Sequence, residues 1–312
     1  MAWTADDLIT AVRRKARLPD DVNGSNASLT DEDILSLANE ATDSLVVPFI
    51  RQHREEYYVV REDFQVEPDR QEYRIPSRAQ GQALRDVVLL NSGGDEVSIP
   101  YVPLEDVGTY RESKSPWWNA GSAFSIRGNQ IILVPTPSDP NITLRLKYHI
   151  RPGRLVKTTQ ADRVDAAPIN GTTLTLTTGP NVTWAPGQEI DIIHGDSPFE
   201  YIQTATVSSL VGNTLTLSDP LDFAIPNQAY IAAKEESPVP QMPSEVHTLL
   251  ITLTTAKCFD ALGHFEGAAA MYAEGDREIK GLSELIEPRV IGEHPVVLNW
   301  NSPLRFGRRR WR

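Results

Sequence analysis

Two short segments near the start of the chain repeat apolar residues at helical spacing. A T-x-x-D signal at Thr4 and Asp7 precedes the first segment, and this pattern caps helix starts because both side chains bond to free backbone N–H groups. The apolar face of the first predicted helix carries Leu8, Val12 and Ala16. The signal returns at Thr30. The apolar face of the second predicted helix carries Ile34, Ala38, Ala41 and Leu45. Pro48 is expected to kink or end this helix, since proline lacks an N–H and clashes with the preceding turn.

From Tyr57 onward the apolar period changes from helical spacing to alternation, which is typical of strands. Three pairs of apolar runs flank turn-like sequences, at residues 67–71, at Gly93 and at Gly128, and each pair predicts a β-hairpin. A further strand alternates cleanly through Ile142, Leu144, Leu146, Tyr148 and Ile150. Residues 57–156 are therefore predicted to form an antiparallel β-domain.

The following stretch, residues 157–233, contains an internal repeat. The sequence "INGTTLTL" (169–176) returns as "LVGNTLTL" (210–217), and "WAPGQEIDII" (184–193) resembles "AIPNQAYIAA" (224–233). Each copy is predicted to form a strand, a loop that contains proline and glutamine, and then another strand. Two such copies that share one core predict a small sandwich or barrel, inserted between helical parts of the chain.

After this repeat the chain returns to helix. Residues 234–243 form a charged, proline-rich stretch that reads as a linker, and Ser244 is expected to cap the helix that follows. Gly263 weakens that helix, which is expected to resume and continue to about residue 288. Beyond Pro288 no helix or long strand is evident, and residues 289–312 read as an extended arm.

The predicted fold class is α+β. A helical core made of two N-terminal helices and a long C-terminal helix carries an antiparallel β-domain, an inserted β-sandwich or barrel and an extended C-terminal arm. The expected segments are a helical hairpin (1–56), the β-domain (57–156), the β-repeat module (157–233), the C-terminal helices (234–288) and the basic arm (289–312).

Charge is distributed unevenly along the chain. The 312 residues carry 30 Lys and Arg against 42 Asp and Glu, a net charge of −12, yet residues 301–312 hold five arginines and no acid. The other 300 residues therefore carry −17. Nucleic-acid-binding proteins neutralise phosphates with clustered Lys and Arg, so the acidic bulk disfavours general nucleic-acid binding.

No catalytic or metal-binding constellation stands out. The six histidines are scattered and none has zinc-site spacing, and the single cysteine, Cys258, excludes an intrachain disulfide and reads as a core residue. The best local cluster is Asp191, His194 and Asp196, which we interpret as a polar turn rather than a metal site. We expect no catalytic residue, metal or cofactor. The first 20 residues lack the apolar run of a signal peptide, and no apolar run is long enough to span a membrane.

The arm combines guanidinium groups with aromatic side chains. Arg, Trp and Phe are enriched among the residues that dominate protein interfaces, which favours a docking role over phosphate binding or a solvated charge run. The candidate binding residues are Leu304, Arg305, Phe306, Arg308, Arg309, Arg310, Trp311 and Arg312.

The order of segments resembles the head-to-tail adaptor, or connector, proteins of tailed bacteriophages. The resemblance rests on "LITAVRRKARLPD", "LTDEDILSLANEATDSLVVPFI", "YRIPSRAQGQALRDVVLL", "IRGNQIILVPTPSDP" and "PSEVHTLLITLTTAKCFDALG", and with the arm it covers everything outside 157–233. It implies a structural virion protein, made in the host cytoplasm and placed at the head–tail junction. Such proteins form a ring, typically of twelve subunits, and the arm clasps the portal protein.

The same resemblance implies further partners. These are a tail nozzle or tail tube protein below the ring, and genome DNA that passes through the channel during ejection without sequence-specific binding. Two alternatives stay open from the residues alone. One is another tail component, either a tail-completion protein or a carbohydrate-binding decoration built on the repeat. The other is a DNA-binding protein that uses the arginine-rich tail. A hydrolase built on Asp191 and His194 is disfavoured, because the usual motifs are missing.

Overall fold

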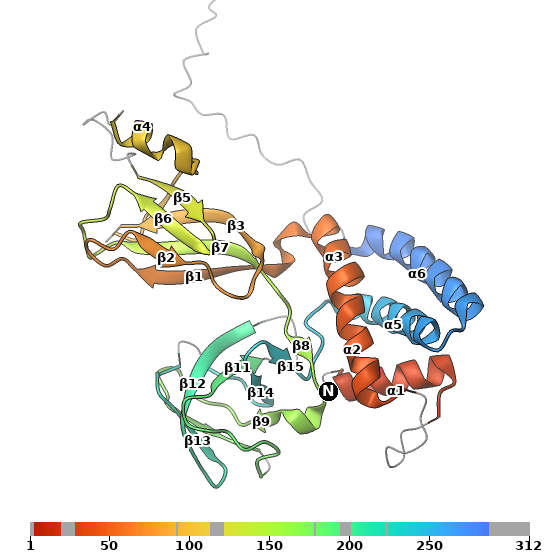
Figure 1. Ribbon diagram of the computed structural model, residues 1–312. Helices are drawn as coiled ribbons and strands as arrows, with labels where there is room; N and C mark the ends of the chain where they lie inside the picture. Colours follow the sequence, from red (N-terminus) through yellow and green to blue (C-terminus); the bar gives the residue numbers. More distant parts are fainter. Residues whose placement is uncertain are drawn as a thin grey trace, which may run out of the picture.

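The computed structural model describes residues 3–19, 29–91, 93–112, 122–177, 179–193, 201–221 and 224–286. Figure 1 shows three parts, with the helices on the right, a β-domain at the upper left and a second β unit at the lower left. The strands pair almost entirely antiparallel, and the helices come from both ends of the chain. The predicted α+β class is confirmed.

The helical part packs around α5, which contacts the helices on either side of it. Its helices are α1 (Ala5–Ala16), α2 (Asp31–Ala41), α3 (Val47–His53), α5 (His247–Ala261) and α6 (Phe265–Ile286). Both predicted capping boxes are present, because Thr4 bonds with Asp7 and Thr30 bonds with Asp33. Residues on every side of α5 are buried, since α1, α2 and α6 all pack against it.

The prediction was that Pro48 would kink or end the second helix, and the structure shows that the helix does not end there. The chain passes from α2 through one π-helical turn, Thr42–Val46, directly into α3, where Pro48 occupies the first turn. A proline is tolerated in a first turn, where its missing N–H needs no partner, and a π-turn shifts the carbonyl that the ring would otherwise meet. The helix therefore continues to His53.

The single long C-terminal helix of the prediction is two helices. Gly263 has φ +77° and lies between α5 and α6, and this left-handed conformation suits a glycine at a helix end. The reversal lets α6 pack back along α5. Ser244 does not cap α5, because a 3₁₀ turn (Ser244–Val246) precedes the helix and its start has no side-chain cap.

The β-domain consists of two sheets. The first has the order β1-β7-β3-β4, and the second has the order β2-β6-β5. The strands are β1 (Val59–Gln65), β2 (Glu72–Arg74), β3 (Ala79–Leu90), β4 (Glu96–Ser98), β5 (Ala123–Arg127), β6 (Gln130–Val134) and β7 (Thr143–Ile150). A short helix, α4 (Val107–Glu112), follows β4. Buried residues of both sheets, such as Leu144 and Ile131, belong to one apolar core.

Two of the three predicted hairpins are confirmed. β3 pairs with β4 around Gly93, and β5 pairs with β6 around Gly128. The first predicted hairpin is wrong, because β1 pairs with β7 whereas β2 pairs with β6 in the other sheet. The turn at residues 67–71 therefore leads from one sheet to the other instead of folding a strand back on its neighbour.

The repeat region forms a nearly closed barrel. Its strands are β9 (Asp162–Val164), β10 (Thr173–Thr175), β11 (Glu189–Ile193), β12 (Tyr201–Val211), β13 (Thr214–Leu217) and β14 (Ala229–Ala233). The sheet order is β10-β13-β12-β11-β14-β9, and a bridge between Val164 and Leu176 joins its two edges.

The two repeat copies are related by internal symmetry within this barrel. Exchanging β9 with β12, β10 with β13 and β11 with β14 reproduces the strand order around the barrel. Matching strands also pair with each other, β10 with β13 and β11 with β14. The bridge from Val164 to Leu176 corresponds to the pairing of Val207 with Leu217. The prediction that two copies share one core is confirmed, and the result is a barrel.

The predicted linker at 234–243 is mostly buried. β8 (Arg154–Leu155) leads into the barrel and β15 (Glu236–Ser237) leads out of it, and the two strands pair in parallel. Residues 237–243 are all buried. A Cβ at Gly153 would lie 3.1 Å from the Cβ of Ser237, so a larger residue there would push the two segments slightly apart. The proline-rich segment is thus a packed strap, because prolines fill apolar space without backbone N–H groups that need partners.

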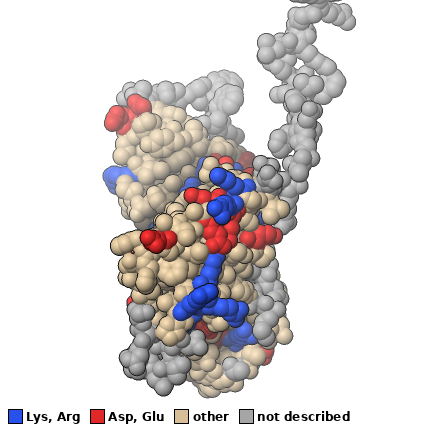
Figure 2. All heavy atoms as spheres, turned by 90° about the vertical axis from the view of Figure 1, so that its right-hand side faces the viewer, with Lys and Arg blue, Asp and Glu red and all other residues tan. Residues whose placement is uncertain are grey.

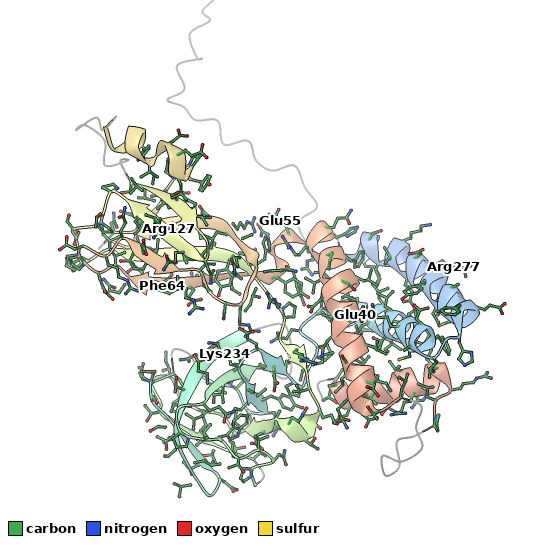
Figure 3. The ribbon with its side chains drawn as sticks, in the orientation of Figure 1. Glu40, Glu55, Phe64, Arg127, Lys234 and Arg277 are labelled. Atoms are coloured by element: carbon green, nitrogen blue, oxygen red, sulfur yellow. The ribbon has the colours of Figure 1, made fainter. Side chains whose placement is uncertain are left out.

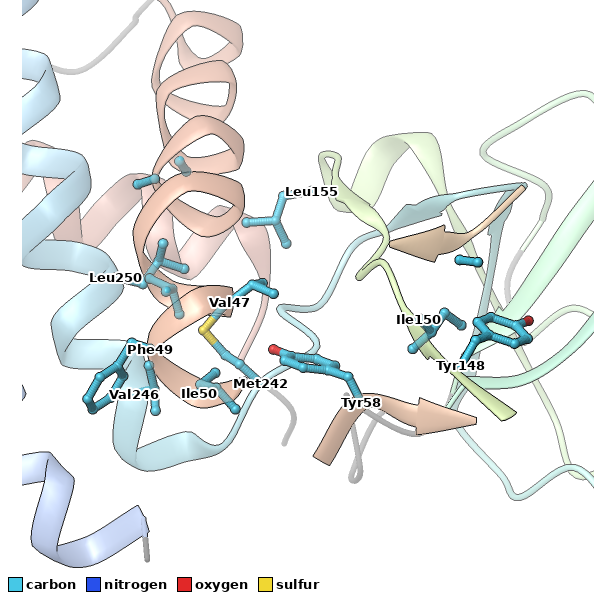
Figure 4. Close-up of a cluster of buried hydrophobic side chains, with 14 of the residues drawn as sticks. Val47, Phe49, Ile50, Tyr58, Tyr148, Ile150, Leu155, Met242, Val246 and Leu250 are labelled. Carbon is cyan, nitrogen blue, oxygen red and sulfur yellow. The ribbon is translucent and has the colours of Figure 1, made fainter. Parts of the chain in front are cut away.

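The helices and the β-domain share a core, but the barrel has its own. Figure 4 shows Tyr58 between Met242 and Ile50 on the helical side and Ile150 on the β side. All four residues belong to one buried cluster. The buried residues of the barrel, such as Trp184 and Ile190, form a separate cluster. The barrel is therefore attached to the rest mainly through its two connecting segments and through polar contacts.

Candidate interaction surfaces

The predicted arm site lies outside the described residues. All eight of its residues fall between 304 and 312, and the description of the chain ends at Ile286. The structure therefore neither brings these residues together nor separates them, and the docking role of the arm stays a prediction.

Among the described residues of the helical part, three large apolar side chains are exposed. Phe265 and Leu285, near the two ends of α6, are 73% and 71% exposed, and Leu45 in the π-turn is 38% exposed. Exposed apolar side chains scattered singly are ordinary, so they mark positions available for contact rather than a site in themselves. Figure 2 shows the helical side with acidic side chains between two groups of basic ones. In Figure 3 Arg277 extends from α6 away from the body of the molecule.

A polar cleft of about 420 Å³ lies where the three parts of the molecule meet. Its walls come from the π-turn region of α2, from the β-domain and from both segments that connect to the barrel. The lining includes Asp43, Arg78, Arg151, Arg154, Lys234 and Glu236. In Figure 3 Lys234 lies between the barrel and the β-domain. Clefts at domain junctions are common places for partners to bind, and π-turns are common next to functional sites.

A buried ion pair joins the β-domain to the barrel beside this cleft. Nη1 of Arg78 donates to Oδ2 of Asp191 at 2.6 Å, and the two side chains are 6% and 0% exposed. Nη2 of Arg78 also donates to the carbonyl of Arg151 at 3.3 Å. The Asp191 carboxylate accepts from the Thr204 hydroxyl at 2.8 Å and from the Glu235 backbone N–H at 2.8 Å. One carboxylate thus joins the turn before β3, two barrel strands and the exit from the barrel.

The connecting segments are fixed to the helical part by side-chain amides. Asn39 on α2 accepts a hydrogen bond from the Leu155 N–H at 2.7 Å and donates to the Leu155 carbonyl at 3.1 Å. Oε1 of Gln241 accepts from the Gly153 N–H at 2.6 Å. The hydroxyl of Tyr58 donates to the Gln241 carbonyl at 3.1 Å. These bonds hold β8 and the strap against the helices, so the cleft has one rigid wall.

The candidate chemistry of the sequence is not assembled into a site. Asp191 lies in strand β11 and in the ion pair, so the interpretation of this stretch as a polar turn is wrong for Asp191, whereas His194 and Asp196 lie outside the described residues. Within the described ranges no three His, Cys, Asp or Glu side chains converge as metal ligands do. Cys258 is buried, and burial raises the pKa of its thiol to about 11.

Arg78 and Asn39 organise the junction, although no pattern in the sequence pointed to them. A signal existed for Asp191, because a single acid inside the apolar run "IDII" must find a partner when the strand is buried. Nothing in the sequence marked Arg78 as that partner, since 113 positions separate the two residues. Asn39 resembled any other polar residue on a helix.

Comparison with known proteins gives the class of this molecule. The fold joins a helical part to two β units, and a polar cleft lies at their junction. The model of the SU10 adaptor protein family matches residues 3–182, more than half of the chain. The chain therefore belongs to the SU10 adaptor protein family and is a structural adaptor of the phage head–tail type.

The family match covers α1 to α3, the β-domain and the first strands of the barrel, and it ends before the second repeat copy and the C-terminal helices. It thus extends into the region from 157 onward, which the resemblance in the sequence had left out. No curated protein matches the chain. No helix within the described ranges is both long enough and apolar enough to cross a lipid bilayer.

Proposed function

We propose that this adaptor forms a ring that joins the phage portal to the tail and surrounds the channel for the genome. The family match carries the proposal, because a protein of this family is an adaptor between parts of a virion. The ring, the portal contact and the tail contact go beyond the match. In this arrangement the helical part forms the ring wall and the barrel projects outward.

The exposed apolar side chains of the helical part support the ring. A cyclic assembly repeats one head-to-tail interface, in which two different faces of the subunit meet. Phe265 and Leu285 lie on α6, and Leu45 lies on the α2–α3 segment, which packs on another side of α5. Two different segments of the helical part thus expose apolar side chains that a head-to-tail interface could bury.

The charge of the chain supports a channel that DNA traverses without being held. The chain has a net charge of −12, and the positive charge of its arm leaves the rest more acidic. Proteins bind DNA tightly when Lys and Arg displace counterions from the phosphates. An acidic wall provides no such gain, so the genome moves past it with little friction.

We further propose that the arm clasps the portal. Arginine pairs with carboxylates through two parallel hydrogen bonds, and Phe306 and Trp311 can fill apolar pockets between such pairs. Ordering an extended arm costs about 1–2 kcal/mol per residue in backbone entropy. Several buried contacts must therefore act together, and their binding should survive moderate salt.

The alternatives gain no support from the described residues. Sugar-binding surfaces usually stack rings on exposed aromatic side chains, but Trp184 and Tyr230 of the barrel are 2% and 3% exposed. Trp184 donates to Asp162 at 2.7 Å and serves the core of the barrel. The DNA-binding alternative rests on the arm alone.

Deleting residues 303–312 tests the clasp. The truncated protein should lose co-assembly with the portal, and neither form should bind duplex DNA. A matched control replaces Arg308, Arg309 and Arg310 with lysines, which keeps the charge but removes the paired hydrogen bonds. The control should assemble weakly. Normal portal assembly without the arm, or salt-sensitive DNA binding that disappears with it, would reject the clasp.

A further inference from the structure

The barrel is joined to the rest of the molecule by polar contacts. Its buried apolar residues cluster separately from the core that the helices and the β-domain share. Besides the ion pair of Arg78 with Asp191, the hydroxyl of Ser77 donates to Glu235 at 3.0 Å and Thr158 donates to Asp6. Interfaces of this polar kind between domains permit relative motion unless specific contacts prevent it.

The exit from the barrel has an unusual backbone. Glu235 has φ +67°, a left-handed conformation that side-chain-bearing residues rarely adopt. Its N–H donates to Oδ2 of Asp191, the same oxygen that accepts from Arg78. The ion pair and the bend at Glu235 are therefore coupled through one atom.

The ion pair is better suited to fixing an orientation than to adding stability. Burial raises the pKa of Asp191, although Arg78 acts to lower it. Replacing both partners of a buried ion pair with apolar residues is often neutral or stabilising, because taking two charges out of water is costly. A misplaced barrel would leave both charges buried without a partner, and that penalty selects one angle.

We infer that the barrel is a hinged body and that the pair of Arg78 with Asp191 is the latch that sets its angle to the β-domain. Asn39 and Gln241 hold β8 and the strap against the helices. Lys157 also pairs with Asp31 of α2 at 3.3 Å, and Thr158 donates to Asp6 of α1. The hinge therefore lies between Thr158 and β9 on the entry side and at Glu235 on the exit side. With the latch closed, Glu235 is held in its left-handed bend and the barrel points in one direction. With the latch absent, the barrel turns about its two connecting segments while its fold persists.

Distances between spin labels test the latch directly in the full-length protein. One label is placed on Val211→Cys at the end of β12 in the barrel, where the side chain is 73% exposed. The other is placed on Gln130→Cys, which is exposed in the β-domain. The native Cys258 is buried with a raised pKa, so it should stay unlabelled.

The latch variant is Arg78→Met with Asp191→Leu, which removes both charges and leaves neither buried alone. The matched control is Lys234→Met with Glu189→Leu, because this pair, at 2.9 Å, is partly exposed and lies within the barrel and its exit. The wild type and the control should give one narrow distance distribution. The latch variant should give a broad or shifted distance distribution. Its amide exchange should be faster at Glu235. Exchange in β11 and β12 should match the wild type, which shows that the barrel stays folded.

A narrow, unchanged distribution in the latch variant would overturn the inference, and so would equal broadening in the control. If the double variant does not fold, Asp191→Asn provides the same measurement, since it removes the charge and keeps the size of the side chain. If Asp191→Asn gives the same narrow distance distribution as the wild type, that result would also overturn the inference.

Discussion

Asn39 occupies the place of a neighbouring strand beside Leu155. Its amide accepts from the Leu155 N–H at 2.7 Å and donates to the Leu155 carbonyl at 3.1 Å, so one helix side chain completes the hydrogen bonding of β8. The contact joins residues 116 positions apart and fixes the entry to the barrel against α2.

Replacing Asn39 with leucine should destabilise the protein. Two partly buried backbone groups would lose their partners, at a cost of about 1–3 kcal/mol for each group that stays unsatisfied. Urea unfolding measures the change. Asn39→Asp is the control, because it keeps the acceptor for the Leu155 N–H, and it should lose less stability than Asn39→Leu. Equal stability of the leucine variant and the wild type would show that water replaces the amide.

Two glycines of α6 should respond oppositely to alanine. A Cβ at Gly275 would lie 3.1 Å from Cδ2 of Leu253 on α5, whereas a Cβ at Gly281 would meet nothing within 4 Å. Gly281→Ala should stabilise the protein by about 0.5–1 kcal/mol, since alanine favours the helix. Gly275→Ala should give no gain or a loss, because α5 and α6 must separate slightly. Thermal unfolding of both variants tests this, and equal gains would contradict the close packing.

His247 should make the fold sensitive to mild acid. Its ring stacks on Trp3 with centroids 4.2 Å apart, and burial lowers the pKa of His247 to about 4. The unfolded chain binds this proton near pH 6.5, so the free energy of unfolding should fall as the pH drops from about 6.5 toward 4. His247→Phe keeps the stacked ring and removes the titration. Its unfolding free energy should fall less over this range than that of the wild type, and identical pH profiles would refute the prediction.

The barrel should be removable without unfolding the rest. In this variant a linker joins residue 156 to residue 234. Because β8 and β15 run parallel, the linker must return by about four residues, or about 13 Å, which six Gly-Ser residues can span. The variant should also carry Arg78→Met, since its partner Asp191 is deleted. Far-UV circular dichroism and cooperative thermal unfolding should persist. An insoluble or non-cooperative product, with the same outcome for longer linkers, would show that the barrel is part of the common core.

The sequence predicted the local elements of this fold well, because each has a local cause. The capping boxes at Thr4 and Thr30 mark the starts of α1 and α2, and Gly93 and Gly128 mark two hairpins. The repeat predicted a shared core because its copies keep the same strand-forming residues. Each of these signals lies within a few residues of the structure that it specifies.

Features that depend on distant residues could not be predicted in the same way. The turn at 67–71 reads as a hairpin until the positions of β6 and β7 are known, because the same turn can reverse a strand or lead to a second sheet. The strap at 237–243 reads as an exposed linker until the helices that cover it are in place. The partner of Asp191 likewise lies in another part of the molecule.

The central claim is that copies of this adaptor assemble into a ring on the portal. Electron cryo-microscopy of the protein mixed with its portal measures this most directly. The expected result is a closed ring with helices α1 to α3, α5 and α6 in its wall and the barrel on the outside. A single copy bound to the portal, or a ring whose contacts leave these helices exposed to solvent, would contradict it.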